Sequence, residues 1–286
     1  MNVTLNDYEN HKYSMCKNII ILFLLLLSFR ASASLGNDVI GSRSTAMGGF
    51  STTLIDLWSV NNNQGALGFV NELSAGISYE NRFLLKETSY KAGSFVMPLK
   101  TGTFGLSITS FGYSAFTENK AGLSYGIKLI ENVAVGVQLN YLNTRLTPEY
   151  GQKNTFTAAI GVVANISKEL TIGVHVYNPI RAKLADYDNE RVPTVMKLGL
   201  DYKFSKKVFL AIETEKDINY APVVKVGVEY HAVEMLYLRG GISTNPTMSS
   251  FGFGVKLKDF KLDLSSSFHQ TLGLTPSVSL IYVKSK

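Results

Sequence analysis

The chain has 286 residues, a net charge of +6 and a hydrophobic fraction of 45%, which allows one large domain or two small ones. A membrane-spanning helix needs about 20 consecutive apolar residues, and the longest apolar run, residues 19–27, is shorter than that. The short apolar run excludes a spanning helix. It is compatible with membrane-spanning β-strands, because half of the residues in each such strand face the lumen and need not be apolar. The basic residues are dispersed on alternating faces, which gives no support for nucleic-acid binding.

The apolar run at residues 19–27 is predicted to be the hydrophobic part of a secretory signal. Lys17 precedes it, and Ala31-Ser32-Ala33 follows it with the small-x-small pattern of a cleavage site. Residues 1–33 are therefore predicted to be a signal peptide that is removed on export.

The start of translation is left open between Met1 and Met15, because the residues before Met15 are polar and add nothing to the signal. The single cysteine, Cys16, precedes the apolar run. The exported chain is thus expected to contain no cysteine, and it needs neither a disulfide framework nor thiol chemistry in an oxidising compartment.

After about residue 70 the sequence alternates with a period of two. From residue 133 to 141 the odd positions are apolar and the even positions are small or polar, and residues 121–129 behave likewise. Successive side chains of a strand point to opposite faces, so each segment has one apolar face. The pattern predicts fourteen strands, at 73–80, 88–98, 103–112, 120–130, 133–142, 155–166, 170–177, 194–204, 207–216, 222–230, 234–242, 249–257, 260–268 and 276–284.

The connections between these strands are predicted to alternate in length. Those after odd strands are long, such as 143–154 and 178–193, and those after even strands are tight, such as 131–132 and 258–259. Long outer loops and short periplasmic turns are typical of outer-membrane barrels, whereas a soluble β-sandwich has no reason to alternate. The sequence therefore predicts an all-β, transmembrane antiparallel β-barrel over residues 73–286, in the cell outer membrane. Both chain termini are predicted to lie in the periplasm.

Charged residues of both signs occupy the inward register in the second half of the barrel. On the lipid side each would cost about 2–4 kcal/mol near the midplane, so they are predicted to face the lumen. A structural ladder of ion pairs between strands is favoured over an ion-selective pore, which stays the alternative. The predicted lumen-facing charges are Lys197, Asp201, Glu213, Glu215, Lys225, Glu229, Arg239, Lys256, Lys261 and Asp263.

Residues 34–72 do not show strand periodicity and are predicted to form a plug-like segment. A glycine-rich string here lacks the lysine and the preceding strand of a phosphate-binding loop. The segment contains Gly41-x-Arg43-x-x-Ala46-Met47-Gly48-Gly49, followed by an Asn-rich stretch that ends in Gly65-Ala66-Leu67. With this pattern it resembles the opening of PorV/PorQ-type proteins, which belong to the wider FadL-like class of fourteen-stranded outer-membrane barrels. The class usually has Asn-Pro-Ala-Gly-Leu where this chain has residues 63–67, Asn-Gln-Gly-Ala-Leu. The residues singled out in this motif are Gly41, Arg43, Met47, Gly48, Gly49, Trp58, Asn63 and Gly65.

The resemblance implies that the opening segment enters the barrel from the periplasmic side and partly plugs it. It also implies two kinds of function. FadL-like members admit hydrophobic small molecules through a lateral or lumenal path, and PorV-like members act on cargo proteins in type IX secretion. The first is the predicted function and the second is the alternative. The expected partners are outer-membrane lipid and lipopolysaccharide, a hydrophobic small molecule, and secretion-system proteins.

An outer-membrane hydrolase is the third and least supported function. The histidines after the signal are His175, His231 and His269, and only His269 lies near serines, Ser265 and Ser267. Nucleophilic catalysis needs a nucleophile, a base and an orienting group within reach. No cluster has the spacing of metal ligands, so the protein is predicted not to be an enzyme and to need no cofactor.

Overall fold

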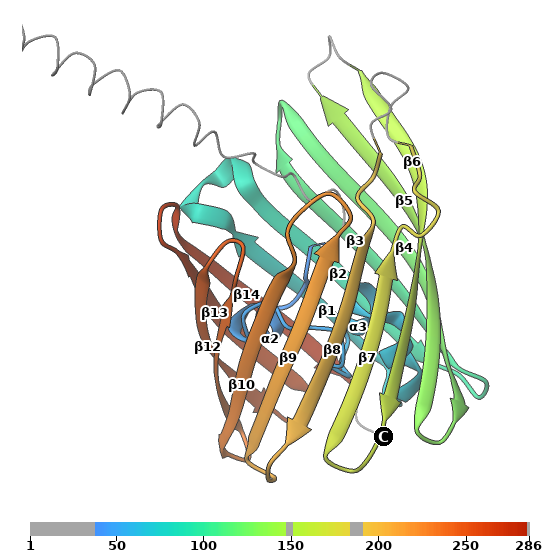
Figure 1. Ribbon diagram of the computed structural model, residues 1–286, viewed down its shortest axis with the longest axis vertical. Helices are drawn as coiled ribbons and strands as arrows, with labels where there is room; N and C mark the ends of the chain where they lie inside the picture. The colour runs from blue at the N-terminus through green and yellow to red at the C-terminus, as the bar shows by residue number, and fades with distance from the viewer. Residues whose placement is uncertain (1–37, 147–150, 184–190, 285–286) are drawn as a thin grey trace, which may run out of the picture. The chain divides into compact units, whose positions relative to one another are not determined.

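The computed structural model describes residues 38–146, 151–183 and 191–284, and the predicted signal peptide lies outside these ranges. Fourteen antiparallel strands form a closed barrel in which each strand pairs with its neighbours in sequence and β1 pairs with β14 (Figure 1). The strands are β1 Ser74–Asn81, β2 Ser89–Pro98, β3 Thr103–Tyr113, β4 Phe116–Ile130, β5 Val133–Leu146, β6 Gln152–Asn165, β7 Leu170–Tyr177, β8 Val195–Lys203, β9 Val208–Asp217, β10 Val223–Val233, β11 Leu236–Ser243, β12 Met248–Leu257, β13 Phe260–His269 and β14 Gly273–Val283. The fourteen-stranded antiparallel barrel predicted from the sequence is confirmed.

The largest departures from the predicted strands occur at the loop ends of β4, β5 and β6. Pairing continues through Thr117 with Arg145 and through Asn143 with Asn154, residues that were expected in loops or at their edges. Side chains support this extension, because Asn154 Oδ1 accepts hydrogen bonds from Tyr141 and Asn143. The connection after β3 is therefore only residues 114–115. The expectation of a long connection after every odd strand was wrong at this position. It was also wrong after β11 and β13, where residues 244–247 and 270–272 are no longer than the connection 99–102 after the even strand β2.

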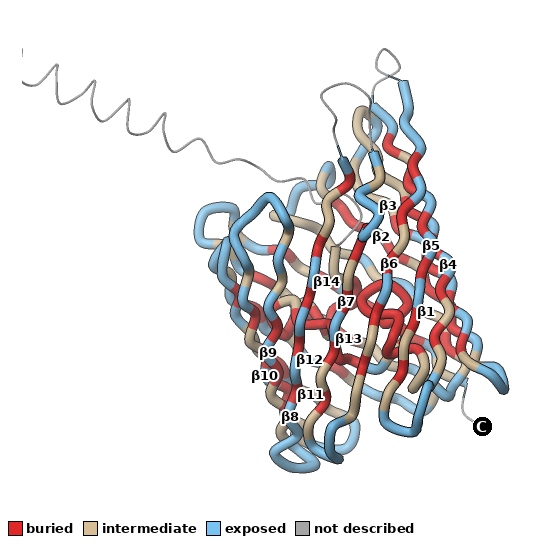
Figure 2. Tube along the Cα trace, turned by 45° about the vertical axis from the view of Figure 1, so that its right-hand side comes forward, coloured by how far each residue is buried: buried red, intermediate tan, exposed pale blue. Residues whose placement is uncertain are grey.

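The two faces of each strand differ as the alternation predicts, and buried and exposed positions alternate along the strands in Figure 2. In β5, Val137 and Leu139 are 52% and 68% exposed, whereas Gln138 and Asn140 are 1% exposed. An apolar outer surface beside a polar interior is the arrangement a barrel needs in lipid. None of the helices in the described ranges is long and apolar enough to cross a membrane.

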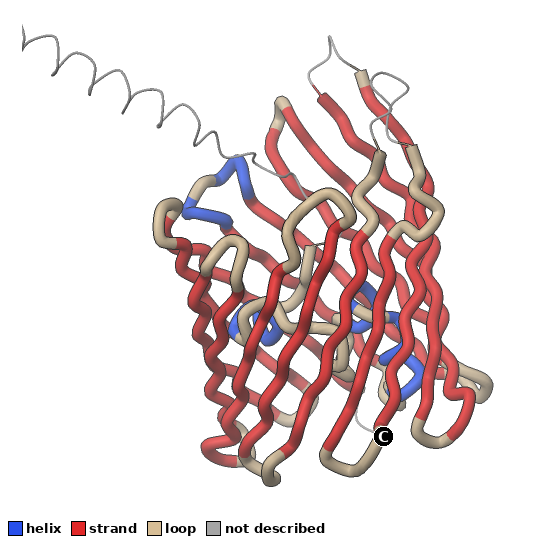
Figure 3. Tube along the Cα trace, in the orientation of Figure 1, coloured by secondary structure: helices blue, strands red, loops and turns tan. Residues whose placement is uncertain are grey.

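The segment before the barrel lies inside it and consists of short helical turns joined by irregular chain (Figure 3). These are α2 (Ser42–Ala46), α3 (Ser59–Asn62) and the 3₁₀ helix η1 (Gln64–Phe69); two further 3₁₀ turns, η2 (Arg82–Leu84) and η3 (Lys86–Thr88), connect β1 to β2. Helix α2 packs on β11 to β14, α3 on β2 and β3, and η1 on β3 to β7. We call residues 38–72 the plug.

The plug crosses the lumen between the two ends of the barrel. At the loop end, Asp38 Oδ1 lies 2.9 Å from Arg82 Nη2 in the β1–β2 connection. At the end with the short turns, the hydroxyl of Thr103, the first residue of β3, donates a hydrogen bond to the carbonyl of Val70 at 3.2 Å. The plug is therefore threaded through the barrel and is not only inserted into its periplasmic mouth.

Two apolar clusters attach the plug to opposite parts of the wall. The larger one joins plug residues to β2 and β14, and the smaller one joins them to β9. Burial of apolar side chains contributes about 25 cal/mol per Å² of area removed from water, so both clusters stabilise the plugged state. The larger consists of Ile40, Leu57, Trp58, Val60, Leu67, Tyr90, Ala92, Val96 and Ile281, and the smaller of Met47, Phe50, Leu54, Phe209 and Ala211.

Candidate functional site: the plugged lumen

Inward-facing glycines let the backbone of the plug touch the backbone of the barrel. A Cβ atom added at Gly126 would lie 2.8 Å from the Gln64 carbonyl oxygen, and one at Gly227 would lie 2.7 Å from that of Met47. Such separations are shorter than real Cβ contacts, so only glycine allows this close approach. The glycines in contact with the plug are Gly76, Gly105, Gly126, Gly136, Gly161, Gly173, Gly199, Gly227, Gly241 and Gly252. We call these residues the glycine girdle; the sequence-based predictions did not include it, although the inward register of these glycines was a usable signal.

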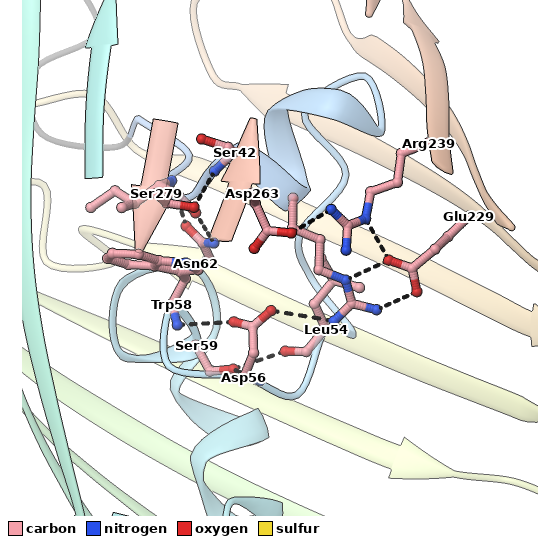
Figure 4. A network of polar contacts seen from close by, with 12 residues as sticks. Ser42, Leu54, Asp56, Trp58, Ser59, Asn62, Glu229, Arg239, Asp263 and Ser279 are labelled. Atoms are coloured by element: carbon pink, nitrogen blue, oxygen red, sulfur yellow. Dashed lines mark hydrogen bonds and ion pairs between the residues drawn. The ribbon is translucent and has the colours of Figure 1, made fainter. Parts of the chain in front are cut away.

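Arg43 of α2 joins the plug to the wall through a network of ion pairs. Figure 4 shows Asp56, Glu229, Arg239 and Asp263 of this network. Arg43 Nε and Nη2 donate to the two oxygens of Glu229 at 2.9 Å each, and its Nη1 lies 3.4 Å from Asp56. Arg239 donates to the same Glu229 at 2.6 Å and to Asp263 at 2.5 Å. Glu229 and Asp56 supply the carboxylates that a guanidinium needs when it has lost most of its hydration inside the lumen.

Glu213 of β9 forms a second polar attachment to the plug. One of its carboxylate oxygens accepts hydrogen bonds from the backbone N–H groups of Ser51 and Thr52 at 2.9 Å each, and from the Thr52 hydroxyl at 2.6 Å. The other oxygen lies 2.9 Å from Lys225 Nζ, which also lies 2.6 Å from Glu215. A buried carboxylate needs such partners because it has lost its hydration. The plug therefore supplies part of the solvation of a charge on the wall.

Amide side chains hold the second half of the plug. Asn63 donates from Nδ2 to the Thr52 carbonyl at 2.6 Å, and its Oδ1 accepts from the Gly65 N–H at 3.0 Å. Gln64 donates to Gln138 of β5 at 3.1 Å, and Gln138 donates to the Val60 carbonyl at 2.9 Å. Asn63 and Gly65, predicted from the motif, thus cap and seat η1 against the wall.

Most of the charges predicted to face the lumen are buried in it. Glu215 and Lys261 are partly buried, and Lys197 lies 3.6 Å from Glu215. Lys256 keeps the inward register near the end of β12, opposite Lys261 in the strand ladder, but it is exposed because the last residues of an inward register meet water at the barrel mouth. The fully buried members are Lys197, Asp201, Glu213, Lys225, Glu229, Arg239 and Asp263.

The histidines do not assemble a hydrolytic site in the described residues. His175 is 1% exposed, and neither ring nitrogen has a hydrogen-bond partner there. His231 lies 3.1 Å from Glu229. His269 accepts hydrogen bonds at Nδ1 from the backbone N–H groups of Thr271 and Leu272, so this ring is used in a turn. In the same described ranges, no group of three or more potential metal ligands was found.

A cavity of about 430 Å³ lies on the outer face of the wall, where β1 to β3 meet β13 and β14. Its floor contains the small outward residues Ala75 and Gly93, and its sides include Ile77, Leu106 and Leu280. We call it the outer groove. Behind it the wall is thin, because a Cβ on the inward-facing Gly76 would lie 2.6 Å from Leu57 in the larger apolar cluster of the plug.

The fold is shared with solved outer-membrane channels, although no family model and no curated protein matches the sequence. The Pseudomonas putida toluene transporter TodX superposes with a TM-score of 0.68 at 12% identity, covering 88% of this chain and 100% of that chain. The Ralstonia pickettii toluene transporter TbuX gives 0.63 at 13% identity, covering 86% and 97%. A Pseudomonas aeruginosa FadL homologue gives 0.63 at 12% identity, covering 87% and 99%.

These similarities define the class of fold. The chain is a closed fourteen-stranded antiparallel barrel whose fold matches that of FadL-type barrels, and its lumen is occupied by its own opening segment. The identities are low, so the likeness concerns the fold and does not by itself transfer a substrate.

Proposed function

We propose that this protein is an outer-membrane channel for small hydrophobic solutes. The observation that carries the proposal is the outer groove, an apolar hollow that faces lipid and is separated from the apolar cluster of the plug by a wall of small residues. The FadL-like fold supports it, because the similar solved structures include proteins described as toluene transporters and a monoaromatic hydrocarbon channel.

The groove suits a hydrophobic solute for an energetic reason. Such a solute gains about 0.8 kcal/mol for each CH₂ group that leaves water, so it concentrates in apolar surroundings. A solute in the groove lies beside Gly76 and Gly93, where no bulky side chain stands between the outer face and the wall backbone. Passage between the groove and the plug cluster then requires only a local separation of β1 and β2.

Filling the outer groove is expected to reduce solute passage. In the Gly93→Trp variant the indole would occupy the space, since a Cβ at this position has no neighbour within 4 Å. We expect uptake of toluene by proteoliposomes to fall several-fold while strand pairing and folding are retained. The matched control is Gly240→Trp, an outward position on β11 whose nearest neighbours are 3.9 Å away. Equal uptake by the two variants and the native chain would contradict this route.

The alternative function, an accessory role in type IX secretion, stays a prediction that rests on the PorV/PorQ resemblance. An exposed apolar patch on the outer loops, such as one around Leu184 and Tyr187, would favour it, and these two residues lie outside the described ranges. No feature of the described residues favours a cargo-binding surface over the channel, so the channel is the function that we propose.

A further inference from the structure

Strands β4, β5 and β6 are longer than the other strands of the wall. They contain 15, 14 and 14 residues, whereas the others contain 8 to 11. About nine to eleven residues of a tilted strand are enough to cross a bilayer. The loop ends of β4 to β6 reach beyond those of β7 to β10 (Figure 1), so these three strands carry residues past the apolar band of the wall.

Strand pairing aligns the outward-facing residues of these loop ends in three rows. The middle row consists of asparagines alone, because Asn119 pairs with Asn143 and Asn143 pairs with Asn154. Alternation along each strand gives one further row on either side. From the loop end, the rows are Thr117, Arg145 and Gln152; then Asn119, Asn143 and Asn154; then Ala121, Tyr141 and Phe156. We call these nine residues the amide patch.

The third row marks the end of the lipid-facing surface on these strands. Tyr141 and Phe156 are 39% and 71% exposed, and their ring centroids are 5.4 Å apart. Toward the short turns, the next outward residues include the exposed Leu123 and Leu139. Aromatic residues concentrate where the hydrocarbon of a membrane meets the headgroups. The asparagine row and the row with Arg145 therefore lie at the level of lipid headgroups.

Hydrogen bonds hold the amide groups of the middle row in fixed orientations. Asn154 Oδ1 accepts from the Tyr141 hydroxyl at 2.8 Å and from Asn143 Nδ2 at 2.7 Å. Neither hydrogen bond uses the amide nitrogen of Asn154 or the amide oxygen of Asn143, which are a donor and an acceptor on adjacent strands. A hydroxyl group both donates and accepts, so this pair matches the hydroxyl groups of a sugar. Because the amides are already oriented, little side-chain entropy is lost when a ligand binds.

Arg145 is the one charged residue of the amide patch, and it is exposed. A guanidinium binds a phosphate group through two parallel hydrogen bonds. The patch therefore offers three kinds of contact in order: aromatic rings for acyl chains, amides for sugar hydroxyls, and a cation for phosphate. An anionic phospholipid matches the first and the last of these but lacks the sugar. A glycolipid that carries phosphate matches all three.

We propose that the amide patch binds the phosphorylated sugar headgroup of lipopolysaccharide in the outer leaflet. The acyl chains lie along the apolar strands beside Tyr141 and Phe156. Sugar hydroxyls bond to the amides of Asn143 and Asn154, and the guanidinium of Arg145 binds a phosphate. None of the nine residues of the patch lines the outer groove, so this inference goes beyond the proposed function and does not depend on it.

The site is tested by titration of protein that has been purified free of lipopolysaccharide. The ligand is fluorescently labelled lipopolysaccharide that retains its inner sugars and phosphates, and its anisotropy is measured in detergent. We expect the native chain to bind it. Arg145→Gln, and separately Asn143→Ala with Asn154→Ala, should each weaken binding roughly tenfold or more, because hydrogen bonds to the headgroup are lost. The matched control is Lys216→Gln, at an exposed lysine on the outward face of β9, and it should bind as the native chain.

Two further ligands show which part of the lipid the patch recognises, after each variant has passed a check for heat-modifiable migration on a gel. Phosphatidylglycerol should compete more weakly than unlabelled lipopolysaccharide, because it has no sugar. Dephosphorylated lipopolysaccharide should bind the native chain and Arg145→Gln alike, because the arginine then has no phosphate to bind. A native chain that does not bind, patch variants that bind like the control, or equal competition by phosphatidylglycerol overturns the proposal. A patch variant with altered oligomeric state and unchanged affinity for lipopolysaccharide also overturns it, and assigns the patch to a second copy of the chain.

Discussion

Deletion of residues 41–67 is expected to convert a closed barrel into one that conducts ions in discrete steps. The deleted residues include α2, α3 and most of η1, which contact strands around the interior. The barrel is expected to survive, because its strands pair through backbone hydrogen bonds in a closed order. The charges that lose plug partners keep others on the wall, since Glu229 retains Arg239 and Glu213 retains Lys225. Single-channel recording in planar bilayers, with the full-length protein beside the deletion, measures the change.

The deletion result is informative only for an intact barrel, so each preparation is first checked for heat-modifiable migration on a gel. Steps of current from the deletion alone identify residues 41–67 as the plug of the conducting path. If a folded deletion variant stays as silent as the full-length protein, the lumen is sealed by other groups and the plug assignment is wrong. Toluene uptake measured on the same preparations separates this result from the outer groove, which the deletion leaves in place.

Gly136→Leu is expected to unseat the plug. A Cβ at this position would collide with the backbone carbonyl of Gln64. Neither backbone can move far, because Gly136 is paired in the sheet and Gln64 begins the 3₁₀ helix that Asn63 caps. Overpacking of a well-packed interior destabilises by about 1–3 kcal/mol, and here the plug must yield before the hydrogen-bonded wall does. We expect added openings in planar bilayers and a lower unfolding temperature of the purified protein.

The matched control for this substitution is Gly240→Leu. Gly240 also lies in the barrel wall but faces outward, and a Cβ added there would have its nearest neighbouring atoms 3.9 Å away. A leucine there should leave both the current and the unfolding temperature close to native values. If Gly136→Leu and Gly240→Leu behave alike, the glycine girdle does not seat the plug, and the inward glycines have no role beyond the strand itself.

The architecture of the wall could be predicted because it is a local property of the sequence. In β5, alternation from Val133 to Tyr141 determines which side chains face outward, and the structure has the same faces. Strand ends were less predictable. Pairing of Asn143 with Asn154 extends β5 and β6 beyond the apolar alternation, since polar residues continue a ladder once a partner strand is aligned. The periodicity of one strand contains no information about the strand that pairs with it.

The site shows a similar division. Arg43, Asn63 and Gly65 could be singled out from the opening motif, and Glu229 and Glu213 from their inward register. That Arg43 meets Glu229, 186 residues away in sequence, depends on how the plug threads through a closed barrel. Register determines the face of a residue but not its height or its partner across the lumen, so no pattern within one strand could predict this pair.

The sequence by itself therefore determined the number of strands, their faces and a non-strand segment ahead of them. This was possible because the apolar alternation with a period of two, and the place where it stops, are properties of a few neighbouring residues. Tertiary structure alone decided three further features: the seating of Gln64 against Gly136, the pairing of Arg43 with Glu229, and the thin wall between the outer groove and Leu57. Each of these contacts joins residues far apart in the chain. Their physical cause is closure of the barrel around its own opening segment, which brings together surfaces that no local pattern relates.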